Sequence, residues 1–369
     1  MTVPELPYSL QHAVRETNAT AIVNRLLRIP AAPPPGFSRD DVAAVVATAS
    51  RHRVFLLLGW FLRDSGTLRE WPGVADVFER AEHQALTVDC VRQAELASVL
   101  RELDAAGVRA IVVKGAALAH THYPAPHVRV RADSDLLVAD EEVHLLENVL
   151  GRLGYARPVE TSGTLVSYQR HYQMTDRFGV THALDVHWKI SNLQALADRL
   201  THTELWNSRV PVAQLGRAAV TVDPPRALAL ALIHRAGHHP GSRNLLWLYD
   251  LHLLESRLTT AERQQFQEVV SARGLTSIAN EGLSMASRTP AADECDTVRS
   301  WTPAEVLGMD LHALPDWRSR GRLLREHLLP PSSYMRAKYG VRSNVVLPAL
   351  YIWRALQGMP KWLRRSPQD

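Results

Sequence analysis

The stretch that decides the fold is VVKGAALAHTHYPAPHVRVRADSDLLV, residues 112–138. A short apolar strand runs into Lys114 and Gly115, a helix of small residues and a proline-broken loop follow, and a second apolar strand carries Asp133 and Asp135 at its start. Side chains alternate across a strand, so residues two apart share one face. The two aspartates are therefore predicted to point the same way, where like charges repel unless a cation joins them.

A third carboxylate lies on a later strand. Residues 167–190 predict a β-hairpin across the turn Arg-Phe-Gly-Val, and Asp185 lies in its second strand. Beside Asp133 and Asp135 it would complete a set of oxygen ligands of the kind that Mg²⁺ prefers, able to hold one or two metal ions for displacement at phosphorus. His187 shares the predicted face of Asp185 and is a candidate contact to the substrate or to an acid.

The junction between the first strand and the helix suits a phosphate group. Gly115 allows the backbone to approach a ligand closely, and the free N–H groups at a helix start favour a polyphosphate. Lys114 and Arg131 are predicted to neutralise its charge. Only four of the 42 basic residues are lysine, so a lysine in this motif is informative.

These residues together resemble a known family. The runs KGAALA and RVRADSDLLV, with LDVHW further on, are similar to the uncharacterised nucleotidyltransferase family of the DNA polymerase beta-like superfamily. The resemblance covers residues 95–260 and implies an α+β fold with a mixed sheet. It implies Asp133 and Asp135 as metal ligands and Asp185 as the third acid, which also helps to activate the attacking hydroxyl. The turn here reads Lys-Gly-Ala where the superfamily has Gly-Ser, so a serine contact to phosphate is missing.

Two downstream segments, LIHRAGHH and LLWLYDLHLL, resemble the later histidine and aspartate motifs of the family. The resemblance implies that His234 and Asp250 line the nucleotide pocket. His234 and His238 are four apart on a helix, which also permits a zinc-dependent His/Asp metallohydrolase, although no His-Glu-x-x-His motif is present. A catalytically silent nucleotide- or peptide-binding accessory protein of a biosynthetic pathway is the other alternative.

The pattern of the chain predicts three regions. Residues 1–107 are an N-terminal helical region, with one helix expected over 38–62 and another that closes at Gly107. Residues 108–192 are the predicted nucleotidyltransferase core, of the polymerase beta-like type, and residues 193–369 are a C-terminal helical region.

Composition excludes several other classes. With 369 residues and 46% hydrophobic content the chain can bury a large core. A net charge of +4 without a lysine-rich tract predicts no nucleic-acid partner. Two distant cysteines, Cys90 and Cys295, and an N-terminus without a signal-peptide pattern favour a reducing cytoplasm. No apolar window is long enough for a transmembrane segment.

We therefore predict a nucleotidyltransferase that uses Mg²⁺ or Mn²⁺ to move an NMP group from an NTP, ATP first among the candidates, to an acceptor. The acceptor, whether small molecule, peptide or protein, is not identified by any motif. The C-terminal segment VVLPALYIWRAL mixes tryptophan, leucine and arginine and permits contact with a partner or a membrane surface. Pro348 and Pro360 are expected to interrupt any long amphipathic helix there.

Overall fold

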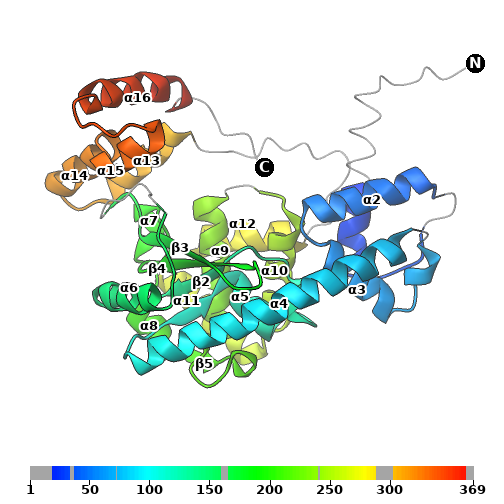
Figure 1. The fold of residues 1–369 in the computed structure, drawn as a ribbon. Helices are drawn as coiled ribbons and strands as arrows, with labels where there is room; N and C mark the ends of the chain where they lie inside the picture. The colour runs from blue at the N-terminus through cyan, green and yellow to red at the C-terminus, as the bar shows by residue number, and fades with distance from the viewer. Residues whose placement is uncertain are drawn as a thin grey trace, which may run out of the picture.

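A four-stranded mixed sheet lies at the centre of the computed structural model, with helices from both ends of the chain around it (Figure 1). The structure describes residues 19–33, 37–71, 73–158, 165–239, 242–287 and 302–362. The strands are β1 (Ile111–Val113), β2 (Ser134–Leu137), β3 (Gln169–Thr175) and β4 (Thr181–His187), in the order β1-β2-β4-β3. The central pair β2 and β4 is parallel, and both outer pairs are antiparallel. The hairpin formed by β3 and β4 confirms the prediction made for residues 167–190.

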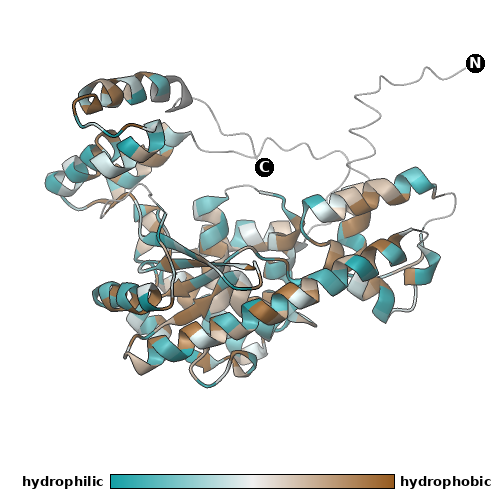
Figure 2. Cartoon of the chain, in the orientation of Figure 1, coloured by the Kyte–Doolittle hydropathy of each residue, from teal (hydrophilic) through white to brown (hydrophobic). Residues whose placement is uncertain are grey.

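The sheet has a hydrophobic core on each face because its residues alternate in direction. Ile111, Val113 and Leu137 point into a core shared with the N-terminal helices and with later helices. Val112 and Leu136 point into a second core, built with the long helix α4 and with α6. Figure 2 shows the hydrophobic residues concentrated in these central strands and in α3. Burial on both faces explains why β1 and the end of β2 read as short apolar runs.

The N-terminal helices are α2 (Arg39–Arg51), α3 (Phe55–Asp64) and α4 (Val74–Ala105). The single helix expected over 38–62 is wrong, because the chain turns at Arg53, whose φ of +57° lies in the left-handed region and ends the first helix. The predicted cap at its start is present as a capping box between Ser38 and Asp41. The long helix α4 closes at Gly107 as predicted, with a φ of +81° there.

Short elements connect the longer helices and the strands. They are α5 (Lys114–Thr121), α6 (Val143–Arg152), α7 (Gln194–Ala197), α8 (His202–Asn207) and the small hairpin of β5 (Arg209–Pro211) and β6 (Val220–Val222), with 3₁₀ turns at 68–70, 126–128, 140–142 and 213–215. The next helices are α9 (Pro224–His238), α10 (Leu245–Ser256), α11 (Thr260–Ala272) and α12 (Thr276–Ser287). The side chain of Asp223 caps α9 and accepts from the backbone N–H of Arg226.

The last helices form a separate group at one end of the molecule (Figure 1). They are α13 (Pro303–Ala313), α14 (Trp317–Leu328), α15 (Ser332–Tyr339) and α16 (Leu347–Trp362). Pro348 lies in the first turn of α16, where proline is tolerated, and the helix continues past Pro360, so the interruption expected at these prolines is wrong. The side chains of Ile352, Trp353 and Leu356 are exposed on α16. Among the described residues no helix has the length and apolar character needed to span a membrane.

Candidate active site

Asp135 and Asp185 are paired across the two central strands, with their Cα positions in register in the parallel pair β2 and β4. Both point to the sheet face that is covered by α9 and α10, on the same side as Val113 and Leu137. Asp133 precedes β2 by one residue and lines the same cavity as the other two acids. The structure thus brings together the three carboxylates that the sequence singled out.

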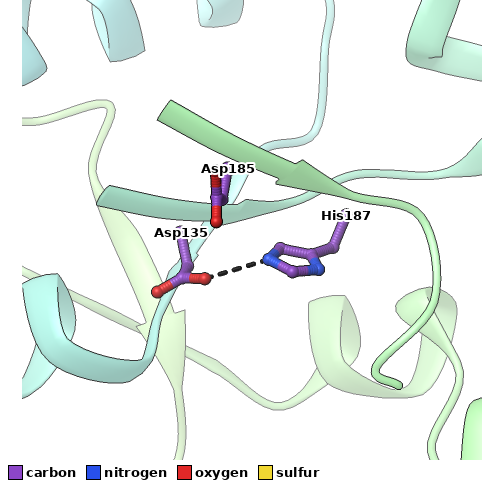
Figure 3. A group of neighbouring side chains, drawn as sticks. All are labelled: Asp135, Asp185 and His187. Atoms are coloured by element: carbon purple, nitrogen blue, oxygen red, sulfur yellow. Dashed lines mark hydrogen bonds and ion pairs between the residues drawn. The ribbon is translucent and has the colours of Figure 1, made fainter. Parts of the chain in front are cut away.

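The tightest group of potential metal ligands differs from the predicted one. Asp135, Asp185 and His187 each offer one ligand atom, and these atoms lie within 4.8 Å of one another. Figure 3 shows the three side chains gathered at the sheet. Asp133 is outside this group, at the entrance to the strand. His187 reaches back along its face so that its Nε2 lies 2.9 Å from Oδ1 of Asp135. The imidazole therefore pairs with an acid, the second of the two contacts considered for it.

Lys114 belongs to the acidic cluster and does not extend freely toward the cavity. Its Nζ donates to Oδ1 of Asp135 over 2.7 Å and lies 3.3 Å from Nε2 of His187. Although burial opposes ionisation of Asp135, the Lys114 ammonium and the His187 ring hold the pKa of that carboxyl well below its usual range. Asp135 is thus a carboxylate at any physiological pH.

Asp133 and Asp185 have different surroundings. Burial, and after it the charges of Asp135 and Asp185, raise the pKa of Asp133. A cation bound close to this carboxylate would favour its ionised form and lower its pKa again. Asp185 is bonded through Oδ1 to Nδ1 of His171, at 2.6 Å. Sequence reasoning missed His171, although it lies opposite Asp185 in the register of the hairpin, so a fixed register would have revealed it.

A cavity of about 1170 Å³ opens over the three acids. Lys114, Gly115, Arg131, His234 and Asp250 line it together with residues of α9, α10 and α13. A Cβ added to Gly115 would lie 3.3 Å from the guanidinium nitrogens of Arg129, so glycine allows this arginine to approach the start of α5. The cavity brings together most of the residues predicted to bind nucleotide.

Two arginines of the motif are engaged in buried ion pairs. Nη2 of Arg131 lies 2.5 Å from Oδ1 of Asp89 on α4, which holds the guanidinium that was expected to neutralise phosphate. Arg129 donates through Nε and Nη2 to the two carboxylate oxygens of Asp250, at 3.0 and 2.7 Å. The hydroxyl of Tyr123 donates to the same carboxylate. Asp250 therefore fixes Arg129, and α4, which shows no catalytic motif in the sequence, orients Arg131.

The histidines in α9 and at its C-terminal cap form an aromatic group with lowered pKa values. The rings of His234 and His238 have centroids 5.0 Å apart, and His239 stacks on Trp247 at 3.9 Å. Burial, with the Lys114 charge next, holds the pKa of His234 well below its usual range and lowers that of His238 to about 4. Within the described residues these rings are not part of a group with metal-ligand spacing, and Asp250 is occupied by Arg129, which argues against the metallohydrolase alternative.

The acidic cluster suits a hard or borderline divalent cation. The two carboxylates offer the oxygen ligands that Mg²⁺ and Mn²⁺ prefer, whereas the imidazole nitrogen is a ligand type better suited to softer ions. In the part of the chain that is described, both bonds to Asp135 go to Oδ1, so Oδ2 remains for an ion. Asp133 lines the same cavity, and a cation there would favour its ionised form against burial and the neighbouring acids.

Comparison with known proteins agrees with this geometry. The model of a family described as uncharacterised nucleotidyltransferases matches residues 38–289, which include the sheet, the three acids and the helices α9 and α10. No curated protein matches the chain. Because the match spans more than half of the sequence, the chain belongs to this family of phosphorus-transferring enzymes.

Proposed function

We propose that the protein transfers an NMP group from an NTP, with ATP the first to test, to a nucleophile on a separate acceptor, and that it needs Mg²⁺ or Mn²⁺ to do so. The observation that carries the proposal is the pairing of Asp135 and Asp185 across β2 and β4, with Asp133 beside them, on the wall of a large cavity. Carboxylates on neighbouring strands, next to a helix start that can receive phosphate, suit displacement at phosphorus.

Each residue has a defined part in this reaction. Asp135 and Asp185 would hold the divalent cation, which when bound offsets phosphate charge and orients the polyphosphate, and Asp133 lines the same cavity and adds negative charge that favours the cation. The backbone at Gly115, at the start of α5, receives phosphate oxygens. The acceptor oxygen forms a bond to the α-phosphorus, the bond from that phosphorus to the bridging oxygen breaks, and pyrophosphate leaves. Asp185, the least buried of the paired acids, takes the proton of the acceptor hydroxyl.

The size of the cavity supports a two-substrate reaction. Pockets for a single small molecule usually measure about 300–1,000 Å³, and this one is larger. Besides the three acids, the residues that line the cavity include Val306, Asp310 and Arg354 from the last helices. These three residues fall outside the range 38–289 that the family model matches. We assign the nucleotide to the acids and the acceptor to the lining contributed by α13 and α16.

Calorimetry with the four NTPs, each with and without Mg²⁺, tests the proposal. The wild-type chain is expected to bind at least one NTP in the presence of the metal, and Asp133→Asn is expected to weaken that binding. Asp198→Asn is the matched control, because Asp198 is an exposed acid paired with Lys189. Absence of metal-dependent NTP binding by the wild-type chain would overturn the proposal. Binding by a chain that releases no pyrophosphate with any acceptor would favour the accessory alternative.

A further inference from the structure

Lys114 has a backbone conformation that its side chain does not favour. Its φ is +54°, in the left-handed region, and among the described residues only Arg53 shares this property outside glycine. Glycine would adopt the same conformation without strain. Strained residues cluster at functional sites, and the Lys114 ammonium lies in such a place, against the acidic cluster.

The ammonium of Lys114 occupies one edge of the group with metal-ligand spacing. Nζ lies 2.7 Å from Oδ1 of Asp135 and 3.3 Å from Nε2 of His187, and those two atoms are 2.9 Å apart. The three atoms form a triangle in which the lysine contacts two of the three candidate ligands. A cation of the chain therefore already sits against the ligand set.

The charges around the site leave room for one divalent ion. Asp133, Asp135 and Asp185 carry three formal negative charges, and in the described part of the chain Lys114 is the lysine or arginine paired with one of them. The other two cations of the motif are neutralised elsewhere, Arg129 by Asp250 and Arg131 by Asp89. Lys114 reduces the cluster to two negative charges, which a single Mg²⁺ or Mn²⁺ balances.

We propose that Lys114 is a resident cation that takes the place of one metal ion, so that the site binds a single divalent cation. This inference rests on the proposed function, in which these acids hold the metal and the nucleotide. Lys114 then remains paired with Asp135 during the reaction and does not swing out to the polyphosphate. The left-handed backbone at the junction of β1 and α5 fixes the direction from which its ammonium enters the cluster.

Binding of Mn²⁺, followed by electron paramagnetic resonance on the full chain, tests this assignment without any turnover. The wild-type protein is expected to bind one Mn²⁺, both alone and with a non-hydrolysable ATP analogue. Lys114→Met, which removes the charge but keeps much of the volume, is expected to bind a second Mn²⁺ or to bind the first at least tenfold more tightly. Lys114→Gly, which also removes the backbone strain, is expected to do the same, whereas Lys114→Arg and Lys189→Met are expected to behave as wild type.

The outcomes separate this inference from the proposed function. Two Mn²⁺ ions in the wild-type chain, or identical Mn²⁺ binding by the wild type and a Lys114→Met variant with a wild-type melting curve, would overturn the resident cation. If Lys114→Met fails to fold, Lys114→Gly answers the same question, because glycine suits the backbone there. If the Lys114 variants gain Mn²⁺ but no chain binds NTP, the inference holds and the nucleotidyltransferase proposal fails. If the wild-type chain binds NTP and the Lys114 variants bind Mn²⁺ as the wild type does, the nucleotidyltransferase proposal holds and the inference on Lys114 fails.

Discussion

Asp135 and Asp185 face each other in register across the only parallel pair in the described part of the sheet. Parallel neighbours keep the same direction, so residues with matching phase on both strands lie on one face. The two carboxylates are then close enough to share a cation, and without a cation their negative charges repel each other. This relationship makes the acidic cluster a property of the sheet and not of a loop, which is the arrangement that holds ligands most precisely.

Substitution of Asp185 is expected to weaken metal binding without lowering the stability of the fold. Asp185→Asn should weaken Mn²⁺ binding at least tenfold, because it removes a charged ligand. The free energy of unfolding should stay the same or rise, because one of three neighbouring negative charges is gone. Metal titration and urea unfolding of the same preparation measure both quantities. A variant that loses metal binding only because it unfolds more easily would contradict the assignment of Asp185 as a ligand.

The ion pair between Arg129 and Asp250 is expected to dominate the stability of the cavity wall. Both side chains are buried, so Asp250→Ala leaves an unpaired guanidinium and should lower the free energy of unfolding by about 3–5 kcal/mol. Tyr123 loses its acceptor in the same variant. Denaturant unfolding measures the loss.

Two further measurements test whether the stability comes from the buried ion pair: a variant of an exposed ion pair and a double variant of the buried one. Lys189→Met breaks the ion pair with the largely exposed Asp198 and should change the free energy of unfolding by less than about 1 kcal/mol. Arg129→Met combined with Asp250→Asn should cost less than the sum of the two single variants, because neither then leaves a buried charge alone. Additive losses would show that the two side chains are not coupled.

The sequence located the acids but not their partners. Periodicity of two predicted a shared face for Asp133 and Asp135, and the hairpin pattern placed Asp185 on a strand. The pairing of Lys114 with Asp135, and of Arg131 with Asp89, depends on contacts between segments 21 and 42 residues apart. Such contacts follow from tertiary packing, which local patterns do not encode.

The helical regions show the same limit. The starts of α2 and α9 could be predicted from their capping residues, Ser38 and Asp223, because a cap is a contact within one helical turn. The break at Arg53 was not predicted, since the sequence around it has neither glycine nor proline. The chain turns there between α2 and α3, which share one hydrophobic core, at a residue that does not favour the left-handed conformation.

The close approach of α3 to α4 gives a stability prediction. A Cβ at Gly59 would lie 2.0 Å from Cδ2 of the fully buried Phe78 ring. Gly59→Ala is therefore expected to lower the free energy of unfolding by about 1–3 kcal/mol or more, despite the gain of about 1 kcal/mol that alanine brings to a helix. Gly151→Ala in α6, where a Cβ meets no atom within 4 Å, is the control and should be neutral or stabilising. Thermal unfolding of both variants, followed by circular dichroism, decides whether the packing of α3 on α4 is as tight as the structure has it.

The buried carboxyl of Asp310 gives a pH dependence with a definite sign. Burial raises the pKa of Asp310 to about 6 from the ordinary 3.8, even though the backbone N–H of Gln194 donates to it. Between these values the folded chain holds a proton that the unfolded chain releases, so the contribution of Asp310 to stability falls as the pH rises. Above pH 6 the loss is complete, at most about 3 kcal/mol.

Asp310→Asn removes this loss, because the amide oxygen still accepts from Gln194 and carries no charge. The melting temperature of Asp310→Asn relative to wild type should therefore be higher at pH 7.5 than at pH 4.5. Asp316 has the opposite sign, because the backbone N–H of Ser319 lowers its pKa at the start of α14. The melting temperature of Asp316→Asn relative to wild type should therefore decrease as the pH rises. Equal pH profiles for the two variants would show that the carboxyl of Asp310 is not buried. The lining that we assign to the acceptor would then be more exposed to solvent than the structure has it.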